Sequence, residues 1–194
     1  MRGRALAVIV AFGVIFPFLA NAQVSLSQDN QYTGFDSSVR ILQPKYWLAK
    51  EKQKSLLNGG SVDQLLIYPQ SEMASRTTRI VVVLKGSAAN IFGLPKEVVS
   101  RVSPLRLVNF YIDQSLRNSL GAHVISTRVT TQGGSKVYEV EWSALIAGGN
   151  RGYFLEKFVF KGDQVYQVDA ESSDIGQTYR DAVKQVADSF EVLK

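Results

Sequence analysis

The residues of this chain with the clearest potential for chemistry are pairs of acidic side chains in its second half. Glu139 and Glu141 could form a general acid/base pair of the glycosidase type, which needs two carboxyl groups facing a substrate. In a β-strand, however, residues two apart point to the same face. Because Val140 and Trp142 occupy the opposite, core-facing side, we expect both glutamates to point to solvent. The pattern therefore predicts no carboxylate catalysis.

The single histidine, His123, limits several other kinds of site. It excludes a metal centre with several histidine ligands, and the lack of cysteine excludes thiolate ligands and a thiol nucleophile. His123 and Asp169 remain candidate metal ligands, with Glu171 as a further acidic neighbour. A structural role for His123 and a helix-capping role for Asp174 are the simpler interpretations. A hydrolase using a serine, His123 and an aspartate is the least favoured class, and we predict no catalytic or cofactor-binding residue.

A glycine-rich stretch, ALIAGGNRGYF from Ala144 to Phe154, resembles a phosphate-binding loop at first sight. Such loops connect a strand to a helix, whose N-terminus faces the anion. Here apolar alternation typical of a strand lies on both sides of Gly148, Gly149 and Gly152. We therefore expect a hairpin turn in which the glycines supply positive φ values.

A basic stretch near the N-terminal third is the candidate binding surface. It interleaves lysines with aromatic residues, namely Lys45, Lys50, Lys52, Lys54, Tyr46 and Trp47. Clustered cations could dock on an acidic protein or an anionic membrane, and Glu51 in their midst lowers the charge slightly. The alternative is an ordinary solvated face.

Strands and two helices must position these residues. Runs of apolar, β-branched and aromatic residues predict strands at 39–42, 63–69, 79–85, 123–130, 136–146, 152–160 and 164–170. Ser103 and Pro104 begin a helix with apolar residues at threes and fours, which ends by Gly121. Asp174 begins a second helix that extends to Phe190, and 86–102 is expected to be a loop with one helical turn. The order of strands, helix, four strands and helix predicts an α+β fold, a central antiparallel sheet flanked by helices.

The first 22 residues have the features of an export signal. Arg2 and Arg4 precede an apolar run, and Ala20-Asn21-Ala22 matches a signal-peptidase site, so 1–22 is interpreted as a signal or thylakoid-transfer peptide. We expect 23–34 to be a flexible segment and 35–194 to form one domain. The formal net charge of the 194 residues is only +5, which does not favour nucleic acid as a partner.

Several short motifs, in order, resemble the PsbP family of extrinsic lumenal proteins of oxygenic photosynthesis. They are GFDSSVRILQPKYW at 34–47, IYP at 67–69, KVYEVEW at 136–142, and GDQVYQVDA at 162–170 followed by ADSFEVL at 187–193. The resemblance covers nearly all of the chain after residue 34. It implies the Mog1/PsbP-like arrangement, an α/β/α sandwich.

The resemblance also implies a non-catalytic role at the thylakoid membrane. Family members bind photosystem II, or assist the assembly of other thylakoid complexes, from the lumen, and support oxygen evolution. Calcium is an ion that the family resemblance alone suggests. The segment 23–34 lacks clear basic residues, so the chain resembles the PsbP-like and PsbP-domain branches of the family more than PsbP itself.

A second class of function stays open beside this one. The chain could be a periplasmic or secreted module that binds a small ligand on the same fold. A pocket lined by Trp47, Tyr68 and Trp142 would favour it.

Overall fold

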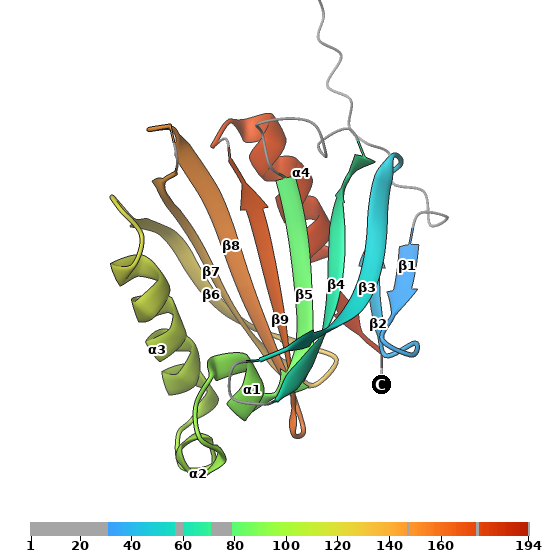
Figure 1. The fold of residues 1–194 in the computed structure, drawn as a ribbon, viewed down its shortest axis with the longest axis vertical. Helices are drawn as coiled ribbons and strands as arrows, with labels where there is room; N and C mark the ends of the chain where they lie inside the picture. The colour runs from blue at the N-terminus through green and yellow to red at the C-terminus, as the bar shows by residue number, and fades with distance from the viewer. Residues whose placement is uncertain (1–30, 57–59, 71–78, 147, 174, 194) are drawn as a thin grey trace, which may run out of the picture.

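Seven antiparallel strands form the large sheet that dominates the molecule (Figure 1). The computed structural model describes residues 31–56, 60–70, 79–146, 148–173 and 175–193. The strands are β3 (Trp47–Ser55), β4 (Ser61–Pro69), β5 (Arg79–Ser87), β6 (His123–Gln132), β7 (Ser135–Leu145), β8 (Arg151–Lys161) and β9 (Gln164–Ser172). Their order is β3-β4-β5-β9-β8-β7-β6, so the last long strand lies between the two halves of the sheet.

A second, three-stranded sheet joins the two ends of the described chain. It consists of β1 (Gln31–Gly34), β2 (Val39–Leu42) and β10 (Glu191–Val192), in the order β1-β2-β10. Residues 31–34, at the end of the segment expected to be flexible, form β1, which pairs with β2. The predicted signal segment, and the rest of the predicted flexible segment up to residue 30, lie outside the described residues.

Four helices complete the described fold: α1 (Ala88–Phe92), α2 (Lys96–Val99), α3 (Pro104–Arg117) and α4 (Gln177–Asp188). The segment expected to be a loop with one turn thus holds two short helices. α3 begins as predicted, with Pro104 in its first turn, but it ends at Arg117. Leu120, placed in its apolar stripe by periodicity, lies beyond the helix and is 75% exposed. α4 begins after Gly176, later than predicted, and Asp174 lies outside the described residues.

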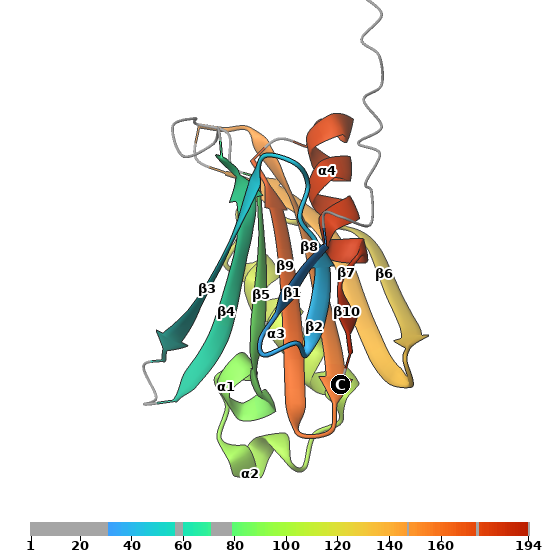
Figure 2. The ribbon, with the colours of Figure 1, turned by 90° about the vertical axis from the view of Figure 1, so that its right-hand side faces the viewer.

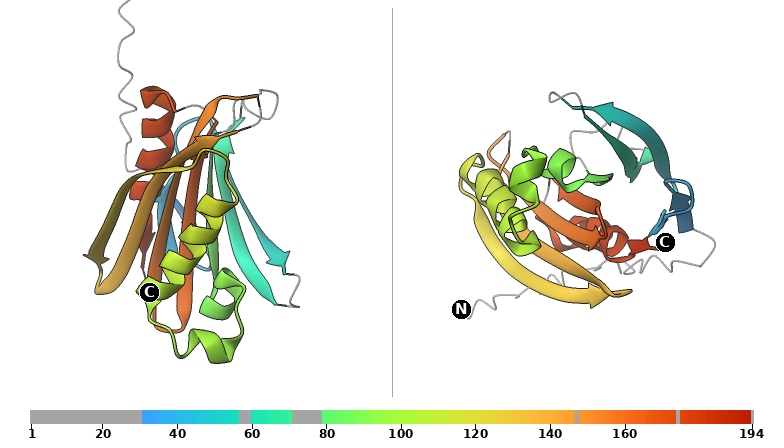
Figure 3. Two further views of the ribbon diagram at one scale, coloured as in Figure 1. Left: turned by 90° about the vertical axis from the view of Figure 1, so that its left-hand side faces the viewer. Right: turned by 90° about the horizontal axis from the view of Figure 1, so that it is seen from below.

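Both faces of the large sheet are covered. The small sheet and α4 lie on one side (Figure 2), and α3 with α1 and α2 lies on the other (Figure 3). Each side has its own apolar core. The core under α4 includes Val183 and Phe190, whereas the core under α3 includes Val108 and Phe158. The predicted α+β class, a central antiparallel sheet flanked by helices, is confirmed.

Within the large sheet, β3 is the strand that the sequence patterns did not predict, and the reason is its position. β3 is an edge strand, and its residues from Lys50 onward are exposed. A strand with one free edge and a solvated face lacks the apolar alternation by which strands are recognised. Among the described residues, no helix is long and apolar enough to cross a membrane.

Candidate functional site

The basic stretch forms a stripe along one edge of the large sheet. Lys50, Lys52 and Lys54 alternate along β3, so their side chains share one face, and all three are exposed. Within the described chain none of the three forms an ion pair. We call these three residues the basic stripe. Lys45 lies apart from it, in the turn before β3, with its Nζ 5.0 Å from the ring centre of Tyr46.

Glu51, which lies among these lysines in sequence, does not neutralise them. Its side chain points to the other face of β3, where Oε1 accepts hydrogen bonds from the Phe35 amide and the Tyr32 hydroxyl, both at 3.0 Å. Burial and this carboxylate raise the pKa of Tyr32. Glu51 thus ties the β1–β2 turn to the sheet and forms no ion pair with the basic stripe.

A second feature is a cavity of about 250 Å³ between α3 and the large sheet. We call it the α3 cavity. Its lining comes from α3 and the segment after it, from β7, and from the facing halves of β8 and β9: Tyr111, Ser115, Asn118, Ser119, Trp142, Phe154, Leu155, Glu156, Asp169, Ala170 and Glu171. Asn118 and Glu171 are exposed, so the cavity can be reached from solvent.

Carboxylates give the α3 cavity its character. Glu156 on β8 and Asp169 on β9 are directly paired across the two strands. The Glu156 side chain is buried, and one of its oxygens, Oε1, accepts a hydrogen bond from Trp142 Nε1 at 3.2 Å. Burial, then the charge of Asp169, raises the pKa of Glu156 above its ordinary value. Burial likewise raises the pKa of Asp169.

The amide of Gln167 organises the other side of the α3 cavity. Its Nε2 donates to both oxygens of Asp169, at 2.9 and 3.1 Å, and to the Tyr111 hydroxyl at 2.8 Å. Burial and the nearby charge of Asp169 raise the pKa of Tyr111, which keeps its hydroxyl protonated. One buried amide therefore fixes α3 against the carboxylates of β9.

The two candidate metal ligands are not brought together. His123 lies exposed on β6 and is separated from Asp169 on β9 by β7 and β8. Because neighbouring strands lie about 4.8 Å apart, three strand steps put these residues about 14 Å apart across the sheet. Nowhere in the described chain do three His, Asp or Glu side chains gather in a group that could hold a metal ion.

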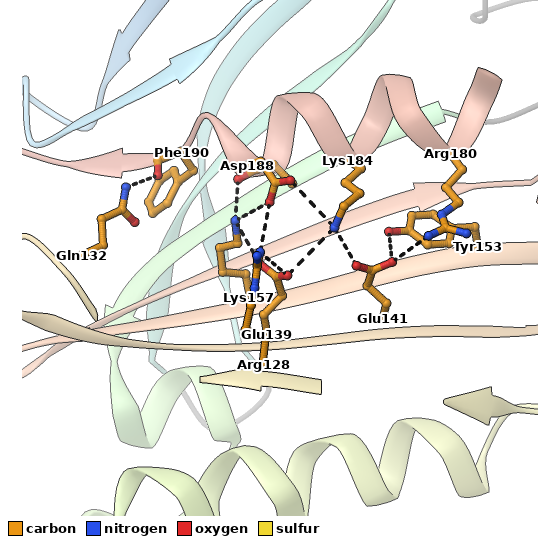
Figure 4. A network of polar contacts seen from close by, with 11 residues as sticks. Arg128, Gln132, Glu139, Glu141, Tyr153, Lys157, Arg180, Lys184, Asp188 and Phe190 are labelled. Carbon is orange, nitrogen blue, oxygen red and sulfur yellow. Dashed lines mark hydrogen bonds and ion pairs between the residues drawn. The ribbon is translucent and has the colours of Figure 1, made fainter. Parts of the chain in front are cut away.

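Glu139 and Glu141 are buried, contrary to the expectation that they face solvent. The face of β7 that carries them is covered by α4, which supplies cations to both (Figure 4). Glu141 accepts from Lys184 at 2.6 Å, from Tyr153 at 3.1 Å and from Arg180 at 3.3 Å.

These contacts have a clear electrostatic result. Burial alone would raise the pKa of Glu141, but Lys184, Tyr153 and Arg180 outweigh it and lower that pKa. A general acid needs the opposite shift, since it must hold its proton near neutral pH. We therefore interpret this cluster as the attachment of α4 to the sheet.

The glycine-rich stretch turns the chain between β7 and β8, as expected of a hairpin. Gly148 and Gly149 have φ values of +91° and +80°, which favour glycine. Gly152 has a different role, because it lies within β8. A Cβ there would lie 3.2 Å from the Ser172 carbonyl oxygen and 2.9 Å from Ile146 Cγ2.

A pocket lined by Trp47, Tyr68 and Trp142 would have favoured the ligand-binding module, but Trp47 and Trp142 do not lie on the same side of the large sheet. Trp47 belongs to the core under the small sheet and α4, whereas Trp142 belongs to the core under α3. The large sheet separates them, and only Trp142 lines the α3 cavity.

Sequence analysis missed Glu156, the central residue of the α3 cavity. A signal was present, because period-two alternation puts Glu156 on one face of β8 with Phe154, Phe158 and Phe160. A single carboxylate in an aromatic stripe indicates a buried acid with a special environment.

Comparison with known proteins places the fold. No protein-family model matches the chain, and no curated protein sequence matches it. Among solved structures, cyanobacterial PsbP (CyanoP) from Synechocystis sp. PCC 6803 superposes with a TM-score of 0.55 over 84% of this chain and 91% of its own, at 15% identity. The fold is PsbP-like.

Two further structures superpose less well. A protein of unknown function, PA94 from Pseudomonas aeruginosa, gives a TM-score of 0.46 at 10% identity and covers 84% of this chain and 96% of its own. LpqN of Mycobacterium tuberculosis, involved in cell envelope biogenesis, gives 0.45 at 14% identity over 80% and 83%. At such identities a likeness concerns the fold, and the PsbP-like fold agrees with the arrangement that the sequence motifs implied.

Proposed function

We propose that this protein is a non-catalytic, exported protein that docks on photosystem II, or on another thylakoid complex, at the lumenal membrane face. The PsbP-like fold supports a peripheral protein of this kind. The basic stripe on β3 is the single observation that carries the docking part of the proposal. It presents three unpaired cations on one face at a sheet edge, which suits an acidic protein surface.

The even spacing of the three lysines favours a partner surface with evenly spaced acidic groups. Lys50, Lys52 and Lys54 are two residues apart, so neighbouring ammonium groups leave the strand about 6.6 Å apart. Such exposed charges mainly steer and orient association, and their effect is screened by salt. The docked protein should therefore be released from thylakoid membranes by a high-salt wash.

The test compares two triple variants with the same change in net charge. One reverses the basic stripe (Lys50→Glu, Lys52→Glu and Lys54→Glu), and the control reverses three exposed cations elsewhere (Lys96→Glu, Arg106→Glu and Lys136→Glu). We expect the stripe variant to bind washed thylakoids at least about tenfold more weakly, and the control to bind as the native protein does. Equal binding of the two variants would exclude the stripe. Absence of the native protein from thylakoids would exclude the photosynthetic location.

A further inference from the structure

The carboxylate of Glu156 in the α3 cavity can accept a further hydrogen bond. The residue is only 6% exposed, and its Oε2 has no hydrogen-bond partner among the described residues, while Oε1 accepts from Trp142. A buried carboxylate oxygen without a donor is costly, because it has lost water and gained nothing in return. Since Glu156 lines the cavity, a ligand there could supply the missing donor.

The charge of the cavity lining indicates which kind of hydrogen-bond donor a ligand should carry. Three carboxylates, Glu156, Asp169 and Glu171, line the α3 cavity, and no lysine, arginine or histidine is among its lining residues. Lys54 acts on Asp169 from β3, and Tyr111 faces the same carboxylates from α3 with its hydroxyl protonated. When these carboxyl groups are ionised, the interior holds an excess of negative charge and of hydrogen-bond acceptors, which a cation that donates N–H bonds would complement.

The shape of the cavity selects the rest of the ligand. Trp142 and Phe154 are stacked, with ring centres 4.3 Å apart and planes 17° apart, which gives a rigid apolar wall. The volume of about 250 Å³ lies just below the usual range for ligand pockets, about 300–1,000 Å³. A bare metal ion would leave this wall unused, and no group of three ligands able to hold one occurs in the described chain.

We propose that the α3 cavity binds a small organic molecule with a primary ammonium group. The ammonium donates to Glu156 Oε2 beside Asp169, and the apolar body of the molecule lies against Trp142 and Phe154. The proposed binding uses other side chains than docking, because the basic stripe contributes no residue to the cavity lining, although Lys54 acts on Asp169 at longer range.

Burial raises the pKa of both Glu156 and Asp169, so a proton competes with the bound cation. The groups that face this pair are Glu171 on β9, Tyr111 on α3 and, at longer range, Lys54 on β3. Because the neutral acid attracts the ammonium less, affinity should increase as the pH rises from about 6 to about 8.

The test titrates the full chain with benzylammonium and with benzyl alcohol, its uncharged counterpart of nearly the same shape. Isothermal titration calorimetry gives the affinities, and quenching of tryptophan fluorescence in a Trp47→Phe variant, whose one tryptophan is Trp142, locates the ligand. We expect the ammonium to bind at least about tenfold more tightly than the alcohol, as a charge-assisted hydrogen bond requires. Equal affinities, or no saturation by benzylammonium at about 10 mM, would overturn the proposal.

Variants then locate the site. Glu156→Gln keeps the shape and removes the charge, and we expect it to weaken benzylammonium binding about tenfold to a hundredfold. Asp163→Asn, in the turn between β8 and β9, is the matched control and should bind as the native chain does. Asp169→Asn provides a second variant should Glu156→Gln fail to fold. Unchanged binding in both cavity variants would exclude this site as an ammonium site.

Discussion

Lys157 on β8 is the residue whose loss should most weaken the attachment of α4. Its side chain is only 6% exposed, and its Nζ lies 3.3 Å from Glu139 and 3.0 Å from Asp188. It also donates to the Ala187 carbonyl at 3.1 Å, in the last turn of α4. A cation at that end of a helix satisfies a carbonyl without an intrahelical partner and complements the helix dipole.

We predict that Lys157→Met lowers the free energy of unfolding by about 3 kcal/mol. Removing one partner of a buried ion pair costs about 3–5 kcal/mol, because the other charge stays buried without compensation. Here Arg128 still contacts Glu139 at 2.7 Å, which favours the lower end of that range. The midpoint of urea unfolding, followed by tryptophan fluorescence, should fall with an unchanged slope.

A double-mutant cycle distinguishes the interaction energy of the Lys157–Glu139 pair from the effect of losing either side chain alone. Once Lys157 is methionine, Glu139→Gln removes the stranded charge, so the double variant should be more stable than the sum of the single losses by about 0.5–3 kcal/mol. Lys136→Met, an exposed lysine on neighbouring β7, is the control and should change stability by less than about 0.5 kcal/mol. Our reasoning would be wrong if Lys157→Met cost no more than this control, or if the two losses were additive.

Four further predictions concern stability. The pKa of Glu141 is lowered in the fold, so its contribution is present above the ordinary carboxyl pKa of about 4 and lost on acidification; the advantage of the native chain over Glu141→Gln in urea should shrink below about pH 4. The effect of pH on the contribution of Glu156 is the opposite, because its pKa is raised in the fold. The native chain therefore loses stability as the pH rises above the ordinary carboxyl pKa of about 4. Between about pH 5 and pH 9, Glu156→Gln should gain stability relative to the native chain, and a constant difference would contradict the shift. Replacing Phe158, which is fully buried under α3, by alanine should lower the free energy of unfolding by about 3–5 kcal/mol, measured by urea unfolding. Gly152→Ala should cost about 1–3 kcal/mol, since the new methyl group meets a backbone oxygen, and a neutral effect in thermal unfolding would show that β8 can shift.

Much of the fold could be predicted from local patterns. The period-two alternation of β7, β8 and β9, and the Ser103-Pro104 pair at the start of α3, are properties of neighbouring residues, so they hold before any tertiary contact forms. Element ends were less predictable, as Leu120 beyond α3 shows. Helix ends depend on what covers the last turn, which periodicity does not contain.

The two candidate sites also differ in how far they could be predicted from sequence. The lysines of the basic stripe could be found from sequence because Lys50, Lys52 and Lys54 are near neighbours in the chain, whereas their shared face on an edge strand came from the structure. The α3 cavity could not, because Glu156 and Asp169 come together only where β9 pairs with β8. Their environment further depends on α3, whose place over that face no local signal specifies.

The sequence by itself thus determined the α+β class, most of the long strands, the two long helices and the clustering of basic residues, all of which follow from residues close in sequence. Only the tertiary structure decided the fate of the acidic side chains. Glu139 and Glu141 became buried partners of α4, and Glu156 became a cavity acid, although all three lie on strands with similar patterns. The physical reason is that the environment of a strand's face is set by the element packed on it, and that element comes from elsewhere in the chain.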